Sequence, residues 1–262
     1  MTAIATDSLS ASADMSENNI NLTGGSGADT IDVTLAAHAQ GTASEGFADV
    51  YAEVTDNEIF INAGDGINDI DVTLTVSASA DGTESYANAR VTGNVIDITG
   101  GSGVDTIDVS LAASAAEGGS SSSARVTDNQ IYVDAGDGDD IITVNLQADN
   151  VSDNSVTITG GSGEDTINLT NAQTNVVLIY NSLDDVGDTI NGFDLGYDMK
   201  FSFDASNFNG ANESGTALAQ SSLFDAADGA QSTVDFWGYG QDTDSGNWQL
   251  LYDADGSGTE TG

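Results

Sequence analysis

The sequence predicts an all-β fold: a parallel β-roll or β-solenoid of about five rungs that tapers toward a C-terminal β cap. Three observations predict it. A glycine-rich turn recurs five times, an asparagine precedes the second glycine of each turn by seven residues, and apolar residues alternate with polar ones on both sides of the turn. Two signals that keep a constant spacing over five copies indicate an internal structural repeat.

The turn copies read GGSGADTID, AGDGINDID, GGSGVDTID, AGDGDDIIT and GGSGEDTIN, and their second glycines lie 39, 37, 35 and 25 residues apart. Those glycines are Gly25, Gly64, Gly101, Gly136 and Gly161, and the upstream asparagines are Asn18, Asn57, Asn94, Asn129 and Asn154. Because Asn tolerates positive φ, we expect each asparagine to occupy a corner of that conformation. We also expect the asparagine side chains to form a ladder along the stack.

Short strands are predicted on both sides of each turn. In the second copy, Ile59 and Ile61 alternate with polar residues before the turn, and Ile70, Val72 and Leu74 do so after it. A period of two with β-branched residues is typical of strands that bury one face. A chain that repeats this unit stacks equivalent strands in parallel, with ladders of Ile and Val inside.

A segment of variable length follows each post-turn strand. Compared with the 25-residue interval, the other intervals carry 14, 12 and 10 extra residues, and all three numbers are even. Residues 74–91 alternate on both sides of a polar DGTE turn, which predicts antiparallel hairpin arms or extended rungs. Flexible loops are the alternative for Ser- and Ala-rich arms. The first rung begins near Ser8, where the sequence resembles the returning arm of a rung whose outgoing arm is missing.

Composition excludes several function classes. Three Lys and Arg against 43 Asp and Glu give a net charge of −40, so the compact chain repels itself unless cations neutralise it. Nucleic acid is excluded as a partner, because phosphate binding needs basic residues. The chain has no Cys and no long apolar run, so we expect neither disulfides nor membrane insertion. The N-terminus lacks the basic start and apolar stretch of a secretory leader.

The motif GGSGADTID matches the nonapeptide G-G-x-G-x-D-x-U-x, and on it the chain resembles RTX repeat proteins, which bind calcium and leave bacteria by type I secretion. The resemblance implies Ca²⁺ held between the glycine turns of successive rungs. Only one edge of the predicted roll carries such turns, so we expect calcium along that edge alone. Five turns offer four inter-turn sites.

The family aspartate falls on Asp29, Asp105, Asp140 and Asp165, whereas the second copy has Asn68 there, followed by Asp69. GGSG and AGDG turns alternate, which predicts sites shared between a terminal Asp of one turn and an internal Asp of the next. The metal-ligating residues that the resemblance implies are Gly25, Gly27, Asp29, Gly64, Asp65, Gly66, Asn68, Asp69, Gly101, Gly103, Asp105, Gly136, Asp137, Gly138, Asp140, Gly161, Gly163 and Asp165.

The C-terminal third differs, so we place the roll at 1–175 and the β-structured cap at 176–262. Residues 176–208 resemble the closing segment of RTX arrays, with matches at Asp188, Ile190, Phe193, Gly196 and Asp198. The large aromatic residues gather here and predict the apolar core of the cap. The tail, residues 247–262, also resembles RTX C-terminal tails. It spaces Asp253, Asp255 and Ser257 as in an EF-hand loop, which indicates a weaker calcium site or a simple turn.

No catalytic motif is present, and His38, the only histidine, has no acidic neighbour in sequence, so we expect no enzyme. The favoured hypothesis is a secreted, extracellular structural protein, such as a surface-layer, matrix or filament subunit, that folds on binding Ca²⁺ and associates head to tail. One alternative is an adhesin module whose arms or cap grip a ligand such as a surface glycan. Another is the secretion domain of a larger enzyme.

Overall fold

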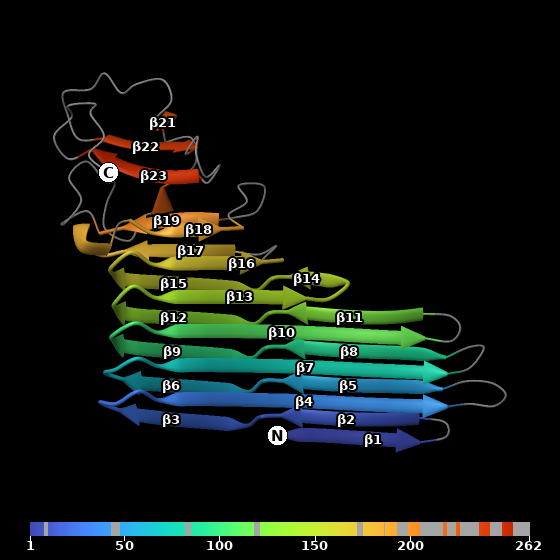
Figure 1. The fold of residues 1–262 in the computed structure, drawn as a ribbon. Coiled ribbons are helices and arrows are strands. Elements are labelled where there is room, and N and C mark those ends of the chain that lie inside the picture. Colours follow the sequence, from blue (N-terminus) through green and yellow to red (C-terminus); the bar gives the residue numbers. More distant parts are fainter. Residues whose placement is uncertain are drawn as a thin grey trace.

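The computed structural model describes residues 1–7, 10–42, 48–81, 85–117, 121–171, 175–185, 187–192 and 199–204, together with short strands at 217–218, 224–225, 236–241 and 248–253. In these residues the fold is a β-solenoid of parallel strands, as the sequence predicts (Figure 1). The expected number of about five rungs agrees with the structure.

Each full rung contains three strands. In the rung that begins with β4 (Thr30–Thr42), the chain turns back through β5 (Asp49–Thr55) and β6 (Glu58–Gly64), and a glycine turn leads into β7 (Asp69–Asp81) of the next rung. The first strands of successive rungs form sheet A, and the second and third strands form sheets B and C on the opposite side.

The remaining strands follow this order. Sheet A also contains β1 (Thr2–Asp7), β10 (Thr106–Glu117), β13 (Ile141–Gln147), β16 (Thr166–Thr170) and β18 (Thr189–Asn191). Sheet B also contains β2 (Ser10–Ser16), β8 (Tyr86–Thr92), β11 (Ser121–Thr127) and β14 (Asn150–Ser152). Sheet C also contains β3 (Asn19–Gly25), β9 (Val95–Ser102), β12 (Gln130–Asp137), β15 (Ser155–Ser162), β17 (Asn175–Tyr180), β19 (Met199–Phe203) and β20 (Ala217–Leu218).

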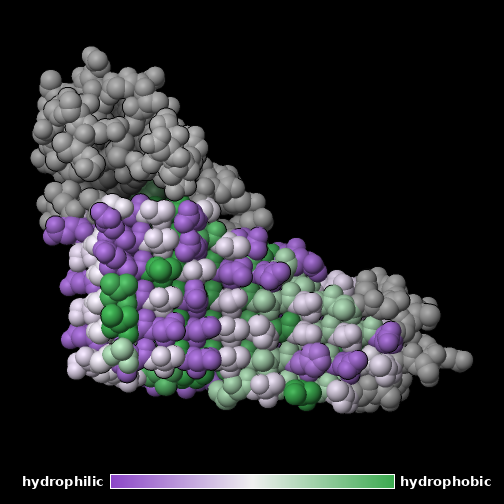
Figure 2. Space-filling view, in the orientation of Figure 1, coloured by the Kyte–Doolittle hydropathy of each residue, from purple (hydrophilic) through white to green (hydrophobic). Residues whose placement is uncertain are grey.

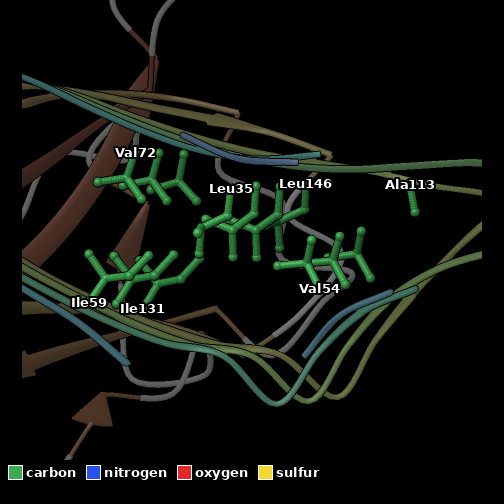
Figure 3. Close-up of a cluster of buried hydrophobic side chains, with 14 of the residues drawn as sticks. Leu35, Val54, Ile59, Val72, Ala113, Ile131 and Leu146 are labelled. Atoms are coloured by element: carbon green, nitrogen blue, oxygen red, sulfur yellow. The ribbon is translucent and has the colours of Figure 1, made fainter. Parts of the chain in front are cut away.

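Equivalent residues of successive rungs stack in register. Ile70 pairs with Ile31 on one side and with Ile107 on the other, and Ile107 pairs with Ile142. Because one residue of slip would turn every apolar side chain outward, the alternating pattern fixes this register. Figure 3 shows the result, with side chains of sheet A facing those of sheets B and C across a single apolar layer.

The variable arms are extended rungs. Each outgoing arm continues a sheet A strand and each returning arm forms a sheet B strand, and both pair in parallel with neighbouring rungs. Antiparallel pairing between the two halves of one arm, the hairpin form of the prediction, is wrong. The reason is burial. Ala37, Ala39, Val50 and Ala52 all face inward and are buried, so the two halves pack face to face instead of edge to edge.

The asparagine corners lie between sheets B and C. Positive φ falls on the residue before each asparagine, at Glu17, Asp56, Gly93, Asp128 and Asp153. The prediction that the asparagine itself has positive φ is therefore wrong by one residue. The asparagine ladder itself is confirmed. The Asn57 Nδ2 donates to Asn94 Oδ1 at 2.9 Å, and Asn94 repeats that bond to Asn129 at 2.9 Å.

The parallel stack extends beyond residue 175. Strands β17 and β19 pair in parallel, Phe201 aligns with Leu178, and the Phe201 ring lies 6.1 Å from that of Tyr180. A 3-10 turn, η1 (Leu183–Asp185), precedes β18. Beyond the stack, β20 pairs antiparallel with β19. Sheet D contains β21 (Phe224–Asp225), β22 (Phe236–Gln241) and β23 (Trp248–Asp253), of which β22 and β23 are antiparallel. Phe193, Gly196 and Asp198 lie outside the described residues.

The first rung has part of its first arm, which corrects the prediction that this arm is missing. Strand β1 pairs in parallel with the outer part of β4, from Thr2 opposite Ala36 to Asp7 opposite Gly41. The exposed surface repeats the rung spacing, since residues of similar hydropathy line up along the stack (Figure 2).

Candidate metal centre

The five glycine turns stack directly on one another at one edge of the solenoid. Gly136 lies in register with Gly101 and Gly161. It has a φ of +105°, and a β-carbon there would lie 1.8 Å from the Gly101 carbonyl oxygen. Only glycine meets both demands, a left-handed conformation and contact with the carbonyl of the neighbouring turn. The recurring glycines therefore bring main-chain carbonyl oxygens into close columns.

A ladder of acidic side chains runs beside these carbonyls. The backbone N–H of each member donates to Oδ1 of the equivalent residue in the next rung. For example, Asp105 N donates to Asp140 Oδ1 at 2.7 Å, and Asp140 N donates to Asp165 Oδ1 at 2.8 Å. The members in order are Asp29, Asn68, Asp105, Asp140, Asp165 and Asp188.

The second carboxylate oxygen separates the middle of this ladder from its ends. Oδ2 of Asp105, Asp140 and Asp165 is buried and accepts no hydrogen bond. At one end, Asp29 Oδ2 accepts from Gly25 N at 2.9 Å, and at the other, Asp188 accepts from the Tyr180 hydroxyl. Leaving a buried charged acceptor without a partner is strongly unfavourable, so Oδ2 of each of the three middle carboxylates needs a positive group or a donor beside it.

Asn68 identifies what such a group would contact. Its Nδ2 donates to the carbonyl oxygens of Gly64 at 3.0 Å and of Gly66 at 3.2 Å. Asn68 is thus an amide in a carboxylate ladder, and its N–H₂ group sits among carbonyl oxygens. Where the ladder residue is Asp, a negatively charged oxygen replaces this donor. A cation bound beside it would satisfy both the carboxylate and the carbonyls.

The first glycine leaves room for two oxygens in the GGSG turns that begin at Gly24 and Gly100. A β-carbon built on Gly100 would lie 2.4 Å from the Ala135 carbonyl oxygen of the next rung and 2.5 Å from Asp105 Oδ2. On Gly24 it would lie 2.2 Å from the Ala63 oxygen. Glycine therefore lets a carboxylate oxygen and a carbonyl oxygen from adjacent turns converge. This donor set, all oxygen and part carboxylate, suits Ca²⁺.

Burial shifts the ionisation of these groups. Desolvation raises the pKa of Asp105, and it raises that of Asp140 to about 7, with the charges of Asp165 and Asp105 adding to it. Desolvation also raises the pKa of Asp165 to about 6 and that of Asp188 to about 7. Carboxyl groups with such pKa values hold their charge at neutral pH only partly unless a cation is beside them.

The internal aspartates lie elsewhere. Asp65 accepts from the Ser102 hydroxyl at 2.8 Å and Asp137 from the Ser162 hydroxyl at 2.6 Å, both on the exposed side of the turns. These Asp–Ser bonds between unlike turns account for the alternation of GGSG and AGDG. Asp69 is exposed at the start of β7. Within the described ranges, no three acidic or histidine side chains gather in one metal-binding group.

Sequence reasoning assigned Asp188 to the cap and missed it as a member of the ladder. The signal was present, because Asp-Thr-Ile occurs at 29–31, 105–107 and 165–167 and again at 188–190. Of the proposed C-terminal site, Asp253 ends β23, whereas Asp255 and Ser257 lie outside the described residues. His38 lies on the exposed face of β4 between Ile4 and Ser77 in register.

Comparison with models of protein families, with curated proteins and with solved structures finds no match to this chain. In the part of the chain that the structure describes, no helix has the length and apolar character needed to span a membrane.

Proposed function

We propose that the chain is a secreted, extracellular calcium-binding structural protein of the RTX type that folds on binding Ca²⁺ and then self-associates. The observation that carries this proposal is the set of three buried carboxylate oxygens without partners, at Asp105, Asp140 and Asp165, beside stacked turn carbonyls. Catalytic chemistry plays no part in it.

Calcium suits these turns for reasons of geometry. Ca²⁺ takes about 6–8 oxygen ligands at about 2.3–2.6 Å and tolerates irregular arrangements. One turn cannot supply that number, but two stacked turns with a shared carboxylate approach it, and water completes the shell. We therefore expect about three ions, beside Asp105, Asp140 and Asp165, where the sequence alone predicted four sites. The neutral Asn68 amide replaces an ion in the second turn.

Calcium binding and folding are coupled in this proposal. The ligands from adjacent turns meet only when the rungs stack, so ions bind the folded chain and not the unfolded one. Ligand that binds only the folded state stabilises it by RT ln(1 + [L]/Kd), about 2.7 kcal/mol for each site at a hundredfold excess over Kd. At cytoplasmic calcium levels, a chain with net charge −40 would stay extended, as passage through a secretion channel requires.

A calcium titration tests the proposal. The chain, freed of metal with chelator at neutral pH, is titrated with CaCl₂ while far-ultraviolet circular dichroism follows β structure and light scattering follows assembly. We expect an unfolded chain without calcium and a cooperative gain of β structure at millimolar calcium, with Mg²⁺ much less effective. A chain that stays fully ordered in chelator and binds no calcium by calorimetry contradicts the proposal.

A further inference from the structure

The N-terminal end of sheet A is half a rung. β1 pairs only with the stretch Ala36–Gly41 of β4, and the amino group of Met1 donates to Thr34 O. Among the described residues, no strand pairs with Thr30–Leu35 on that side. Figure 1 shows the consequence: β1 lies below one half of β4, the N-terminus is near the middle of the row, and no described strand lies in the other half of the row.

Main-chain groups of β4 point into this empty half-row. Asp69 N donates to the Asp29 carbonyl, so Asp29 faces β7. Residues of a parallel strand alternate in the side to which both their N–H and C=O groups point. Thr30 and Asp32 therefore direct theirs toward the empty position. These are the groups that a further strand would pair with.

The apolar core is also incomplete at this end. Ile31 and Ile20 are only partly buried, whereas their equivalents Ile70 and Ile59 in the next rung are fully buried. The missing cover lies over the glycine-turn half of the core, the half where sheet A has no strand. A strand in that position would bury both the free backbone groups and these side chains.

The edge lacks the usual protection against pairing. Natural edge strands carry Lys, Pro or bulges that block other chains. Here β1, β2 and β3 read TAIATD, SASADMS and NINLTGG, with no Lys, Arg or Pro. In a chain with 43 acidic residues, these three strands contain only Asp7 and Asp14. The edge is therefore flat and weakly charged.

We infer that this end binds the same end of a second copy in a twofold-symmetric, head-to-head dimer. The twofold axis is perpendicular to the sheets and passes through the middle of the β1 row. It places the partner's β1 in the empty half-row, antiparallel to Thr30–Leu35. The two half-rows then complete one shared row, and the two N-termini meet near Leu35. Because β2 and β3 exchange places under this rotation, each pairs antiparallel with the other strand of the partner copy.

The far end of the solenoid is less suited to the same contact, because β20 already pairs along the outer edge of β19. The head-to-head end measures about 43 Å along thirteen residues and about 10 Å across two sheets, so both copies together bury about 900 Å². That is below the range of stable, specific interfaces and within that of weak ones, so we expect a dissociation constant in the micromolar range or weaker. The dimer needs the folded solenoid, so its calcium dependence rests on the proposed function.

Sedimentation equilibrium on the calcium-saturated chain tests the dimer, after circular dichroism has verified β structure. The substitution Asn21→Pro blocks the β3 edge without loss inside the monomer. Asn18 O accepts from Glu58 N, so by alternation Asn21 directs its N–H outward, where an edge strand tolerates proline. We expect a dimer for the native chain and for the matched control Asn21→Thr. We expect a monomer, or at least a tenfold weaker dimer, for Asn21→Pro.

A second variant fills the empty half-row with added residues of the same chain. Met1 lies opposite Leu35, so copying the five residues Asp69–Thr73 ahead of Met1 extends β1 in register along Thr30–Thr34 and removes the position that the partner's β1 occupies. We expect this extended chain to be a folded monomer. A folded native chain that stays monomeric at all concentrations, or variants that dimerise as tightly as the native chain, overturns the inference and leaves calcium-dependent folding intact. A dimer that forms equally well in chelator supports the inference and contradicts the proposed function.

Discussion

Two side-chain ladders run along the solenoid, one at the asparagine corners and one at the glycine turns, and both use the same main-chain bond. In each, a backbone N–H donates to Oδ1 of the equivalent residue in the next rung, as Asn94 N does to Asn129 and Asp105 N does to Asp140. They differ in the second side-chain atom. The Asn94 Nδ2 donates to Asn129 Oδ1 and to the carbonyl oxygens of Val54 and Thr92. The Asp105 Oδ2 has no partner.

The difference teaches that one backbone geometry can make either a self-sufficient ladder or one that needs a cation. The asparagine ladder supplies its own donors and is neutral. The aspartate ladder supplies only acceptors in its buried middle, so its stability depends on what the solution provides. Asn68 shows that the choice is made residue by residue, because one amide in the second ladder is satisfied in the way the first ladder is.

The largest expected effect comes from making the second ladder resemble the first. We expect the triple variant Asp105→Asn, Asp140→Asn, Asp165→Asn to fold in calcium-free buffer and to lose its response to calcium. Each buried unpaired group costs about 1–3 kcal/mol, so the gain in free energy of unfolding without calcium is roughly 3–9 kcal/mol. Circular dichroism of both chains without calcium, and urea denaturation of the variant without calcium and of both chains in calcium, test it.

The control for this variant changes the same number of charges on the surface. Asp32, Asp71 and Asp108 stack in register on the exposed face of sheet A. Replacing all three with Asn relieves self-repulsion equally but leaves the turns unchanged. If this control folds without calcium as readily as the ladder variant, net charge and not the buried carboxylates governs folding.

The reverse exchange should give the next largest effect. In Asn94→Asp, a carboxylate replaces the amide that donates to Val54 O and Thr92 O. Because an uncompensated buried charge results, we expect a loss of about 3–5 kcal/mol. Urea denaturation in calcium measures it, with Asn21→Asp on the exposed face of β3 as the control. If the stability of Asn94→Asp recovers at higher calcium concentration, the asparagine corners also accept an ion.

The glycine turns offer a smaller and more local test. In Gly136→Ala, the new β-carbon meets the Gly101 carbonyl oxygen in a left-handed conformation, and such strain costs about 1–3 kcal/mol. In Gly25→Ala, a β-carbon meets nothing within 4 Å. We expect calcium affinity, measured by calorimetry, to fall only in the first variant. Equal behaviour of the two would mean that the turns do not stack as described.

The sequence predicted the parts of the fold that are periodic. Stacking in register follows from the alternation of residues such as Ile70 and Val72 and from the fixed spacing of Asn57 and Gly64, since both signals are local and repeat. The pairing partners of the arm strands were harder to predict from the sequence. An alternating arm is compatible with an antiparallel hairpin or with an extended rung, and only packing of inward residues such as Ala52 against the opposite sheet decides between them.

The candidate site was predictable in composition but not in detail. The Asp29-type position follows from the motif, whereas the satisfaction of each carboxylate depends on contacts between rungs. Asp188 is satisfied by Tyr180, eight residues earlier in sequence, and Asp65 by Ser102 of the following turn. No local pattern distinguishes a carboxylate that has such a neighbour from one that lacks it.

The last expected effect is that of pH on the calcium-free chain. Asp140 and Asp188 have folded-state pKa values raised to about 7, and Asp165 to about 6, against an unfolded value of 3.8. Between about pH 4 and pH 7 the folded state therefore binds more protons than the unfolded state, so stability without calcium falls as pH rises through this window.

Calcium should reverse this sign. Ca²⁺ binds the ionised carboxylates, so protons compete with it, and stability at a fixed, subsaturating calcium concentration should rise from pH 5 to pH 7.5. Circular dichroism at both pH values measures the folded fraction in metal-free buffer, and thermal denaturation measures stability in calcium, which gives the two slopes. The Asn triple variant lacks the titrating groups of Asp140 and Asp165 but keeps Asp188, so both slopes should become smaller without vanishing. If the slopes of the native chain have the same sign with and without calcium, the buried carboxylates do not bind the ion, and the two ladders differ in charge alone.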